Sequence, residues 1–226
     1  MRQTRRLAAL GAMTVLAVAL AGCSASEVPP APAPTSAPDA AAPTSGPPTA
    51  DDGVTTVDEV FGPGCSTLPQ GDAPGSAAAM AGLPVAAAVG TNPSLTTLAR
   101  AISAVPGLAE TLNAQQDITL FAPSNAAFDA ARAALGDEAY NALMDDPQQL
   151  SMLLSYNVVA QRFDAAGLVR AGTTTELTGG EVTIGGTAAA PTLTGGDGTQ
   201  ATVLCGDLPT KNATVFVIDK VLRPTG

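Results

Sequence analysis

The stretch Ile118-Thr119-Leu120-Phe121-Ala122-Pro123-Ser124-Asn125-Ala126-Ala127-Phe128 decides the fold. Its first five residues are β-branched or apolar and predict a buried strand, which ends at Pro123 because proline has no N–H to donate to a sheet. A helix is expected to begin at Ser124 or Asn125, since both residue types cap helix N-termini well. We expect Phe121 and Phe128 to pack this strand and this helix onto one core.

Two helices on either side of this stretch carry clear start signals. Asn92-Pro93 provides an N-cap and a first-turn proline, and leucines and an isoleucine then recur at helical spacing until Pro106-Gly107. Asp146-Pro147-Gln148-Gln149 repeats this arrangement with a glutamine at the third helical position, a capping box. The buried stripes that follow these two starts are Leu95, Leu98 and Ile102, and Leu150, Leu153 and Leu154.

The C-terminal part of the chain changes to short strands. Residues 176–204 are rich in Thr, Val and Gly, with glycine pairs that predict turns. Val182 and Ile184 alternate with polar residues, as in a half-buried strand, and residues 214–222 predict a longer strand buried on both faces. Helices first and antiparallel strands later predict an α+β domain whose body is a β-sandwich or barrel.

Three blocks of this sequence resemble the fasciclin (FAS1) family. They are the stretch Ile118–Phe128, the stretch Leu153–Val159 and the last block Val215–Pro224. The resemblance is greatest to the secreted and lipid-anchored fasciclin-domain surface antigens of mycobacteria and related actinobacteria, in which a Gly-Pro-Gly-Cys opening is similar to residues 62–65. It implies an α+β, wedge-shaped fold of two β-sheets flanked by helices over residues 62–226. It also implies a role in adhesion rather than in chemistry.

The resemblance implies an interaction surface near the second and third blocks. Family members usually carry Tyr-His in the second block, where this chain has Tyr156-Asn157. Tyr156, Asn157 and Asp219 are therefore the candidate residues for that surface. A structural role is the alternative: Tyr156 as a core ring with a bonded hydroxyl, and Asp219 as a carboxylate that braces the last strand.

The N-terminus predicts export and lipid attachment. Three arginines precede an apolar run of about 15 residues, shorter than the ~20 residues of a membrane-spanning helix. Leu20-Ala21-Gly22-Cys23 resembles a bacterial lipobox, so residues 1–22 are expected to be a signal peptide and Cys23 to carry lipid. A plain secretory signal is the alternative. Sec and twin-arginine export both stay open. We expect a protein anchored to the outer face of the cell membrane, with release from it also open.

Residues 23–61 are expected to form a stalk, with the fasciclin domain at 62–226. The segment after Cys23 is dominated by Pro, Ala, Ser and Thr and has almost no large apolar residue, so it cannot bury enough surface to fold. Cys65 and Cys205 are then an even pair in an exported chain, which predicts a disulfide.

Composition excludes several classes of function. Without the signal, the chain has 7 basic and 20 acidic side chains. This negative charge repels both nucleic-acid phosphates and anionic lipid headgroups, so we expect no binding to nucleic acid. The lipid on Cys23 is then the expected contact with the membrane. The chain has no histidine, and no nucleotide-binding or metal-binding motif supports a cofactor. We expect a protein that is not an enzyme and has no catalytic, cofactor or metal residues. Its expected function is adhesion to an extracellular protein or glycan. The alternative is an envelope carrier of a small apolar ligand such as a lipid.

Overall fold

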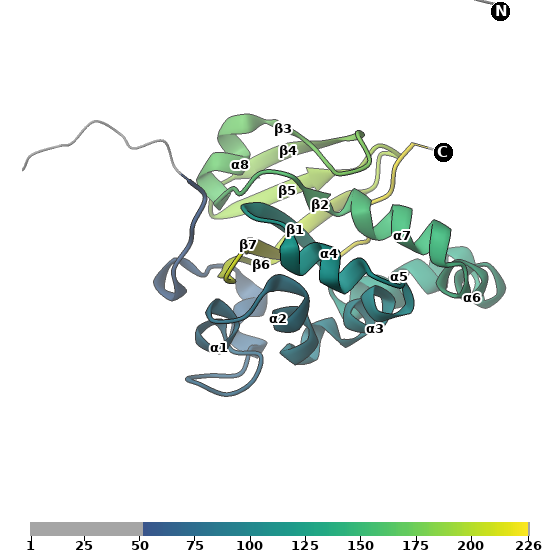
Figure 1. The fold of residues 1–226 in the computed structure, drawn as a ribbon. Coiled ribbons are helices and arrows are strands. Elements are labelled where there is room, and N and C mark those ends of the chain that lie inside the picture. The colour runs from purple at the N-terminus through teal and green to yellow at the C-terminus, as the bar shows by residue number, and fades with distance from the viewer. Residues whose placement is uncertain (1–51, 226) are drawn as a thin grey trace, which may run out of the picture. The chain divides into compact units, whose positions relative to one another are not determined.

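The computed structural model describes residues 52–225 as an α+β domain (Figure 1). Its α-helices are α1 Ala77–Ala81, α2 Val85–Thr91, α3 Thr96–Ala104, α4 Leu108–Ala114, α5 Asn125–Leu135, α6 Asp137–Asp145, α7 Pro147–Tyr156 and α8 Ala165–Ala171. Short 3-10 helices are η1 Val57–Glu59, η2 Pro63–Thr67 and η3 Pro93–Leu95. The strands are β1 Ile118–Pro123, β2 Val158–Val159, β3 Thr173–Thr175, β4 Glu181–Thr187, β5 Ala190–Thr194, β6 Gln200–Pro209 and β7 Ala213–Ile218.

The strands of this described range form one strongly bent sheet in the order β2-β1-β7-β6-β5-β4-β3. Strand β6 belongs to both halves: its first residues pair with β5 and its last residues pair with β7. The two edges of the sheet approach each other where Val159 bridges Glu176 and the Leu177 N–H donates to the Val158 carbonyl. The sheet is therefore nearly closed, which agrees with the predicted α+β fold of two β-sheets flanked by helices.

Strands β1 and β7 pair in parallel, whereas the other paired strands of the described chain are antiparallel. Every residue of both strands is buried. Alternate side chains point to opposite faces, so Leu120 and Val215 pack against the helices, while Phe121 and Phe216 lie in a second core with Leu168.

The placement of Phe121 corrects one expectation. Phe128 on α5 packs in the core that faces the helices, but Phe121 lies in the core on the other side of the sheet, with its ring centroid 6.2 Å from that of Phe216. The two phenylalanines thus serve two cores rather than one. The reason is the strand period of two residues, which turns Phe121 away from the side chains of Leu120 and Ala122.

The predicted end of the strand and start of the helix in the block Ile118–Phe128 are confirmed, whereas the predicted end of the last strand is wrong. Ser124 caps α5 by accepting the Ala127 N–H, and its own N–H donates to the Ile218 carbonyl at the end of β7. Strand β7 ends at Ile218 rather than at Leu222, because the chain turns at Asp219 and Lys220. The two predicted helix caps, Asn92 and Asp146, are confirmed: each accepts a backbone N–H from the following turn.

Asn212 joins the helical half of the domain to the start of β7. This buried side chain accepts the Val85 N–H at 2.8 Å and donates to the Leu112 and Gln115 carbonyls, each at 2.8 Å. One amide thereby satisfies the N-terminus of α2 and the C-terminus of α4. Because the Val85 and Leu112 groups are buried, loss of the amide would leave them unpaired at a cost of about 1–3 kcal/mol apiece.

The packed chain begins before the predicted boundary at Gly62. The buried Thr214 hydroxyl donates to the Gly53 carbonyl at 2.7 Å, and Phe61 bridges Gly206 on β6. Gly53 has a φ of +67° and lies against the Arg162 carbonyl, where a Cβ would clash at 2.4 Å. The lead-in is therefore part of the folded unit from Gly53 onward.

Cys65 and Cys205 form a disulfide with their Cα atoms 4.9 Å apart. The bond ties η2 to the middle of β6 and closes a chain separation of 140 residues. For a loop of that length the chain-entropy account gives at most about 5 kcal/mol of stabilisation, through the restricted unfolded chain. The bond holds the lead-in against the strand that both halves of the sheet share.

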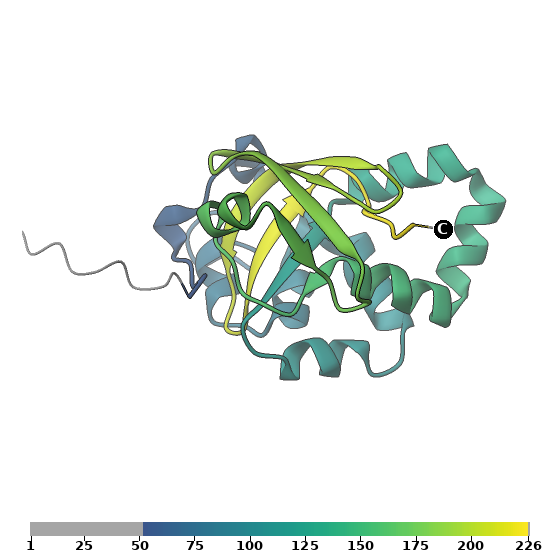
Figure 2. The same cartoon turned by 90° about the horizontal axis from the view of Figure 1, so that it is seen from above.

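Three predictions fall on residues that the structure does not describe: the signal peptide at 1–22, the lipid on Cys23 and most of the stalk at 23–61. Within residues 52–225, no helix combines the length and the apolar character needed to cross a bilayer. The start of the coloured ribbon and α6 lie at opposite ends of the domain (Figures 1 and 2).

A buried carboxyl group interrupts β6. Asp207 lies in a bulge between Cys205 and Leu208, has a φ of +53°, and accepts the N–H of Ala165 at the start of α8, 2.9 Å away. The pKa of Asp207 is raised from 3.8 to about 7, mainly by burial. The hydrogen bond from the Ala165 N–H acts to lower this pKa, and the nearby carboxylates of Asp164 and Glu59 act to raise it. Ionisation of Asp207 therefore opposes folding.

We predict that Asp207→Asn stabilises the protein at pH 8. Because the pKa of Asp207 is higher in the folded than in the unfolded protein, its ionisation lowers the free energy of unfolding. This loss is absent below pH 3.8, grows with pH, and is complete above about pH 7. Asparagine keeps the acceptor for Ala165 and tolerates a positive φ. The gain in unfolding free energy should be at most about 4 kcal/mol at pH 8 and should vanish toward pH 4. Denaturant melts at both pH values measure it, with exposed Asp58→Asn as the matched control. An equal effect at both pH values would contradict the account.

Candidate functional site

Two of the three residues predicted for the interaction surface are buried. Tyr156 and Asn157 are each 1% exposed, so neither side chain can contact a partner at this surface. The Tyr156 hydroxyl donates to the Glu181 carbonyl at 2.8 Å and accepts the Gly196 N–H at 2.7 Å. Burial raises the pKa of Tyr156, which keeps the hydroxyl in the protonated form that donates. Tyr156 therefore holds α7 to the β4 and β5 side of the sheet.

Asn157 and Asp219 likewise brace the chain around the ends of β1 and β7. The Asn157 amide donates to the carbonyls of Leu153 and Leu222. Asp219 is half-buried, and its carboxylate accepts the Thr202 N–H at 2.7 Å. The structural alternative thus describes Tyr156 and Asp219. The expectation of an interaction surface at Tyr156 and Asn157 is corrected by the burial of both side chains.

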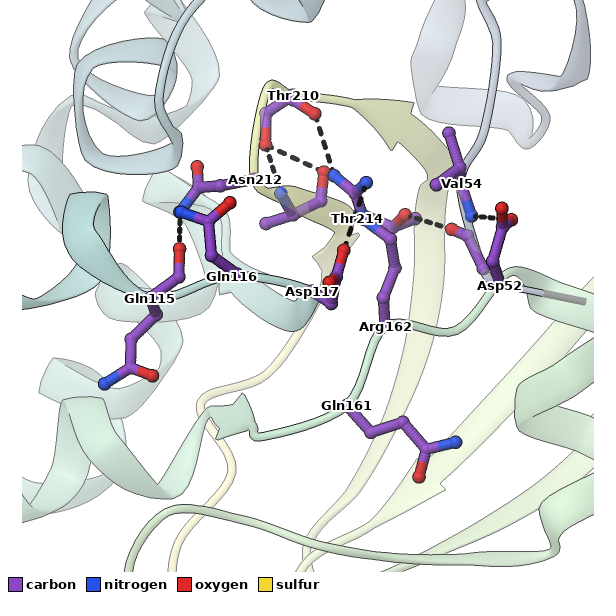
Figure 3. A network of polar contacts seen from close by, with 12 residues as sticks. Asp52, Val54, Gln115, Gln116, Asp117, Gln161, Arg162, Thr210, Asn212 and Thr214 are labelled. Atoms are coloured by element: carbon purple, nitrogen blue, oxygen red, sulfur yellow. Dashed lines mark hydrogen bonds and ion pairs between the residues drawn. The ribbon is translucent and has the colours of Figure 1, made fainter.

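A polar cleft of about 470 Å³ lies beside Arg162, between the start of β1 and the segment after β2 (Figure 3). Sequence reasoning did not single it out. Its polar lining comes from four exposed residues and one buried residue. The exposed ones are Asp52, Gln116, Asp117 and Gln161, and the buried one is Arg162.

Arg162 anchors the floor of this cleft. One terminal nitrogen of its guanidinium donates to the Thr210 carbonyl at 2.9 Å, and the other lies 3.9 Å from an Asp117 carboxylate oxygen. Burial lowers the pKa of Arg162, while the carboxylates of Asp117 and Asp52 act to raise it. Among residues 52–225, no group accepts a hydrogen bond from its Nε. The cleft therefore combines a buried cation with exposed amides and carboxylates in its lining.

A second hollow is an apolar groove of about 220 Å³ at the end of the domain that carries α6. Its floor and walls come from α5, α6, α7 and the segment after β7. The lining residues are Ala127, Ala130, Ala131, Ala134, Leu135, Tyr140, Leu143, Leu153, Thr199, Lys220, Val221 and Arg223. Burial in this hollow is the main cause that raises the pKa of Tyr140, with Asp129 raising it further and Arg132 lowering it.

The domain model that matches this chain is that of the fasciclin domain, over residues 93–224. The chain belongs to the fasciclin family. As a fasciclin-domain protein it is 37% identical over 231 residues to cell surface glycolipoprotein MPB83 of Mycobacterium bovis, covering 96% of this chain and 95% of that protein. It is 38% identical to immunogenic protein MPT70 of Mycobacterium tuberculosis, covering 74% of this chain and 83% of that one.

The fold of this fasciclin domain is also seen in a solved structure. A FAS1 domain pair from the insect cell adhesion molecule fasciclin I superposes with a TM-score of 0.54 at 13% identity. The match covers 62% of this chain and 51% of that chain. The family resemblance inferred from the three sequence blocks is therefore confirmed. The polar cleft and the apolar groove are described from this structure and not from the comparisons.

Proposed function

We propose that this fasciclin-domain protein is exported, held at the cell surface by lipid on Cys23, and binds an extracellular ligand. The lipobox-like residues 20–23 and the short apolar run before them support the anchor. Further support comes from the relatives named cell surface glycolipoproteins, since the likeness to them extends over 96% of this chain. The role is binding rather than catalysis, because the family relatives are described as surface or immunogenic proteins and the chain has no histidine to act as a base.

Replacement of Cys23 by alanine should release the protein. Without the sulfur there is no attachment point for the acyl chains that hold a lipoprotein to a bilayer. We expect the Cys23→Ala protein to leave the detergent phase, or to remain unprocessed, in phase partitioning of whole cells. Ser24→Ala is the matched control and should stay in the detergent phase. Detergent partitioning that Cys23→Ala leaves unchanged would contradict the anchor.

The proposed function at the surface is adhesion to an extracellular glycan through the polar cleft. The observation that carries it is the lining of this cleft, in which two exposed amides and two exposed carboxylates lie beside the buried Arg162. Amides both donate and accept hydrogen bonds, carboxylates accept, and the guanidinium donates. Such a mixed set suits a ligand rich in hydroxyls, because each hydroxyl is both donor and acceptor. Two carboxylates beside one cation disfavour anionic polymers.

The adhesion site is tested by removal of the two exposed amides. We expect the double variant Gln116→Ala, Gln161→Ala to bind glycans at least about tenfold more weakly on a glycan array and in calorimetry, since two lost hydrogen bonds cost about 1 kcal/mol each. The double variant Gln148→Ala, Gln200→Ala removes two exposed amides elsewhere and should bind as the parent does. Equal losses in both variants, or no glycan binding by the parent, would refute adhesion through this cleft.

A second candidate function is the carriage of a small apolar ligand in the groove between α5, α6 and α7. The specific observation in its favour is the lining, which consists largely of alanine and leucine side chains. A concave site with an apolar lining and a few polar groups is the usual form of a small-molecule site. Mass spectrometry of protein purified from the producing cells would detect a retained ligand.

A further inference from the structure

We propose that the apolar groove binds a single-chain fatty acid, with the acyl chain in the groove and the carboxylate at Lys220. This inference rests on the second candidate function and names the ligand class of that groove. The polar cleft beside Arg162 is a separate site at the start of β1, and adhesion through it does not depend on what the groove binds.

The shape and lining of the groove suit one acyl chain. Small side chains on α5, such as Ala130 and Ala131, leave the hollow open, and Leu143 and Leu153 form its apolar walls. The volume of about 220 Å³ lies below the roughly 300–1,000 Å³ of sites for drug-sized ligands. A two-chain lipid would therefore not fit, whereas one narrow chain of methylenes would fit and would bury apolar surface along its length.

The charged residues in the lining of the groove define the head group. Lys220 and Arg223 are two of the seven Lys and Arg side chains of residues 52–225, and both line this one groove in a chain of net charge −10. Arg223 is paired with Asp197 at 3.0 Å, so its charge is already balanced. Lys220 is exposed and, within residues 52–225, has no ion-pair partner. One exposed ammonium group in the lining of an otherwise apolar groove is complementary to one carboxylate.

Helix α6 gives the groove a wall that can adjust to chain length. None of its residues is fully buried, although Tyr140 and Leu143 contact the core. It is joined to α5 through Gly136, which has a φ of +81°, and to α7 through Asp146-Pro147. A helix with few buried contacts opens at low cost compared with the core of a domain.

The experiment titrates decanoate, octanoate, decanol and decyltrimethylammonium into the full-length chain carrying Cys23→Ala, so that no attached acyl chain competes. Calorimetry measures affinity, and NMR amide shifts locate the site. We expect decanoate to bind most tightly, octanoate about tenfold more weakly than decanoate, and decyltrimethylammonium most weakly. Lys220→Met should weaken decanoate about three- to tenfold and leave decanol unchanged, while Lys211→Met, in the turn between β6 and β7, should change neither.

A groove-filling pair of variants separates the ligand site from its charge. Ala131→Leu places a larger side chain in the groove and should weaken decanoate and decanol alike by at least tenfold. Ala133→Leu adds the same bulk to the same helix outside the groove and should leave both affinities unchanged. If decanol binds as tightly as decanoate and Lys220→Met leaves the decanoate affinity unchanged, the fatty-acid proposal is overturned while the carrier function stands. No binding of any probe, or equal losses in Ala131→Leu and Ala133→Leu, would overturn both.

Discussion

The parallel pairing of β1 with β7 is the constraint on which the rest of this domain depends. It aligns Ile118–Pro123 with Ala213–Ile218 residue by residue, although these segments are far apart in the sequence. Both strands are buried on both faces, so the pair forms the wall between the core under the helices and the core inside the bent sheet. A strand pair buried on two sides contributes to both cores at once, and a slip in its register would displace every side chain of each.

The same pairing places the two hollows at opposite ends of one strand pair. Parallel strands start together and end together. Asp117, just before β1, therefore lies near Thr210, just before β7, and Arg162 bridges them at the polar cleft. At the other end, α5 follows β1 while Lys220 and Arg223 follow β7, and these segments line the apolar groove. The first end collects buried hydrogen bonds and charges, and the second end collects alanines and leucines, so the two sites suit ligands of opposite polarity.

The sequence was sufficient to predict the parts that depend on local signals. The caps at Asn92, Ser124 and Asp146, the α+β order and the family were predictable because each follows from adjacent residues or from an ordered set of blocks. The parallel partner of β1 was not predictable, since a run such as Val215–Ile218 is apolar on both faces and carries no mark of its neighbour or direction. The core assignment of Phe121 failed for a related reason: it depends on which face of the sheet meets the helices.

The sites were harder to predict than the fold. Tyr156 and Asn157 were candidates because they are polar residues in a signature block. Their hydrogen-bond partners, such as Gly196 and Leu222, lie on distant segments that come near only in the folded chain. The Arg162 cleft and the Lys220 groove are assembled from residues without a motif, from three or more elements each. The sequence offers one weak signal for both sites. Arg162 and Lys220 are two of only seven Lys and Arg residues after residue 51, so each of these few positive charges was a candidate for a binding role.

Native-state amide hydrogen exchange tests the central place of the β1–β7 pair most directly. If the pair is the wall between both cores, the amides of residues 119–122 and 214–217 should exchange slowest, together, and with the free energy of global unfolding. Amides of α6 and of the β3–β4 hairpin should exchange earlier, through partial opening. Faster exchange in β1 or β7 than in β4 and β5, or separate exchange of β1 and β7, would contradict the account.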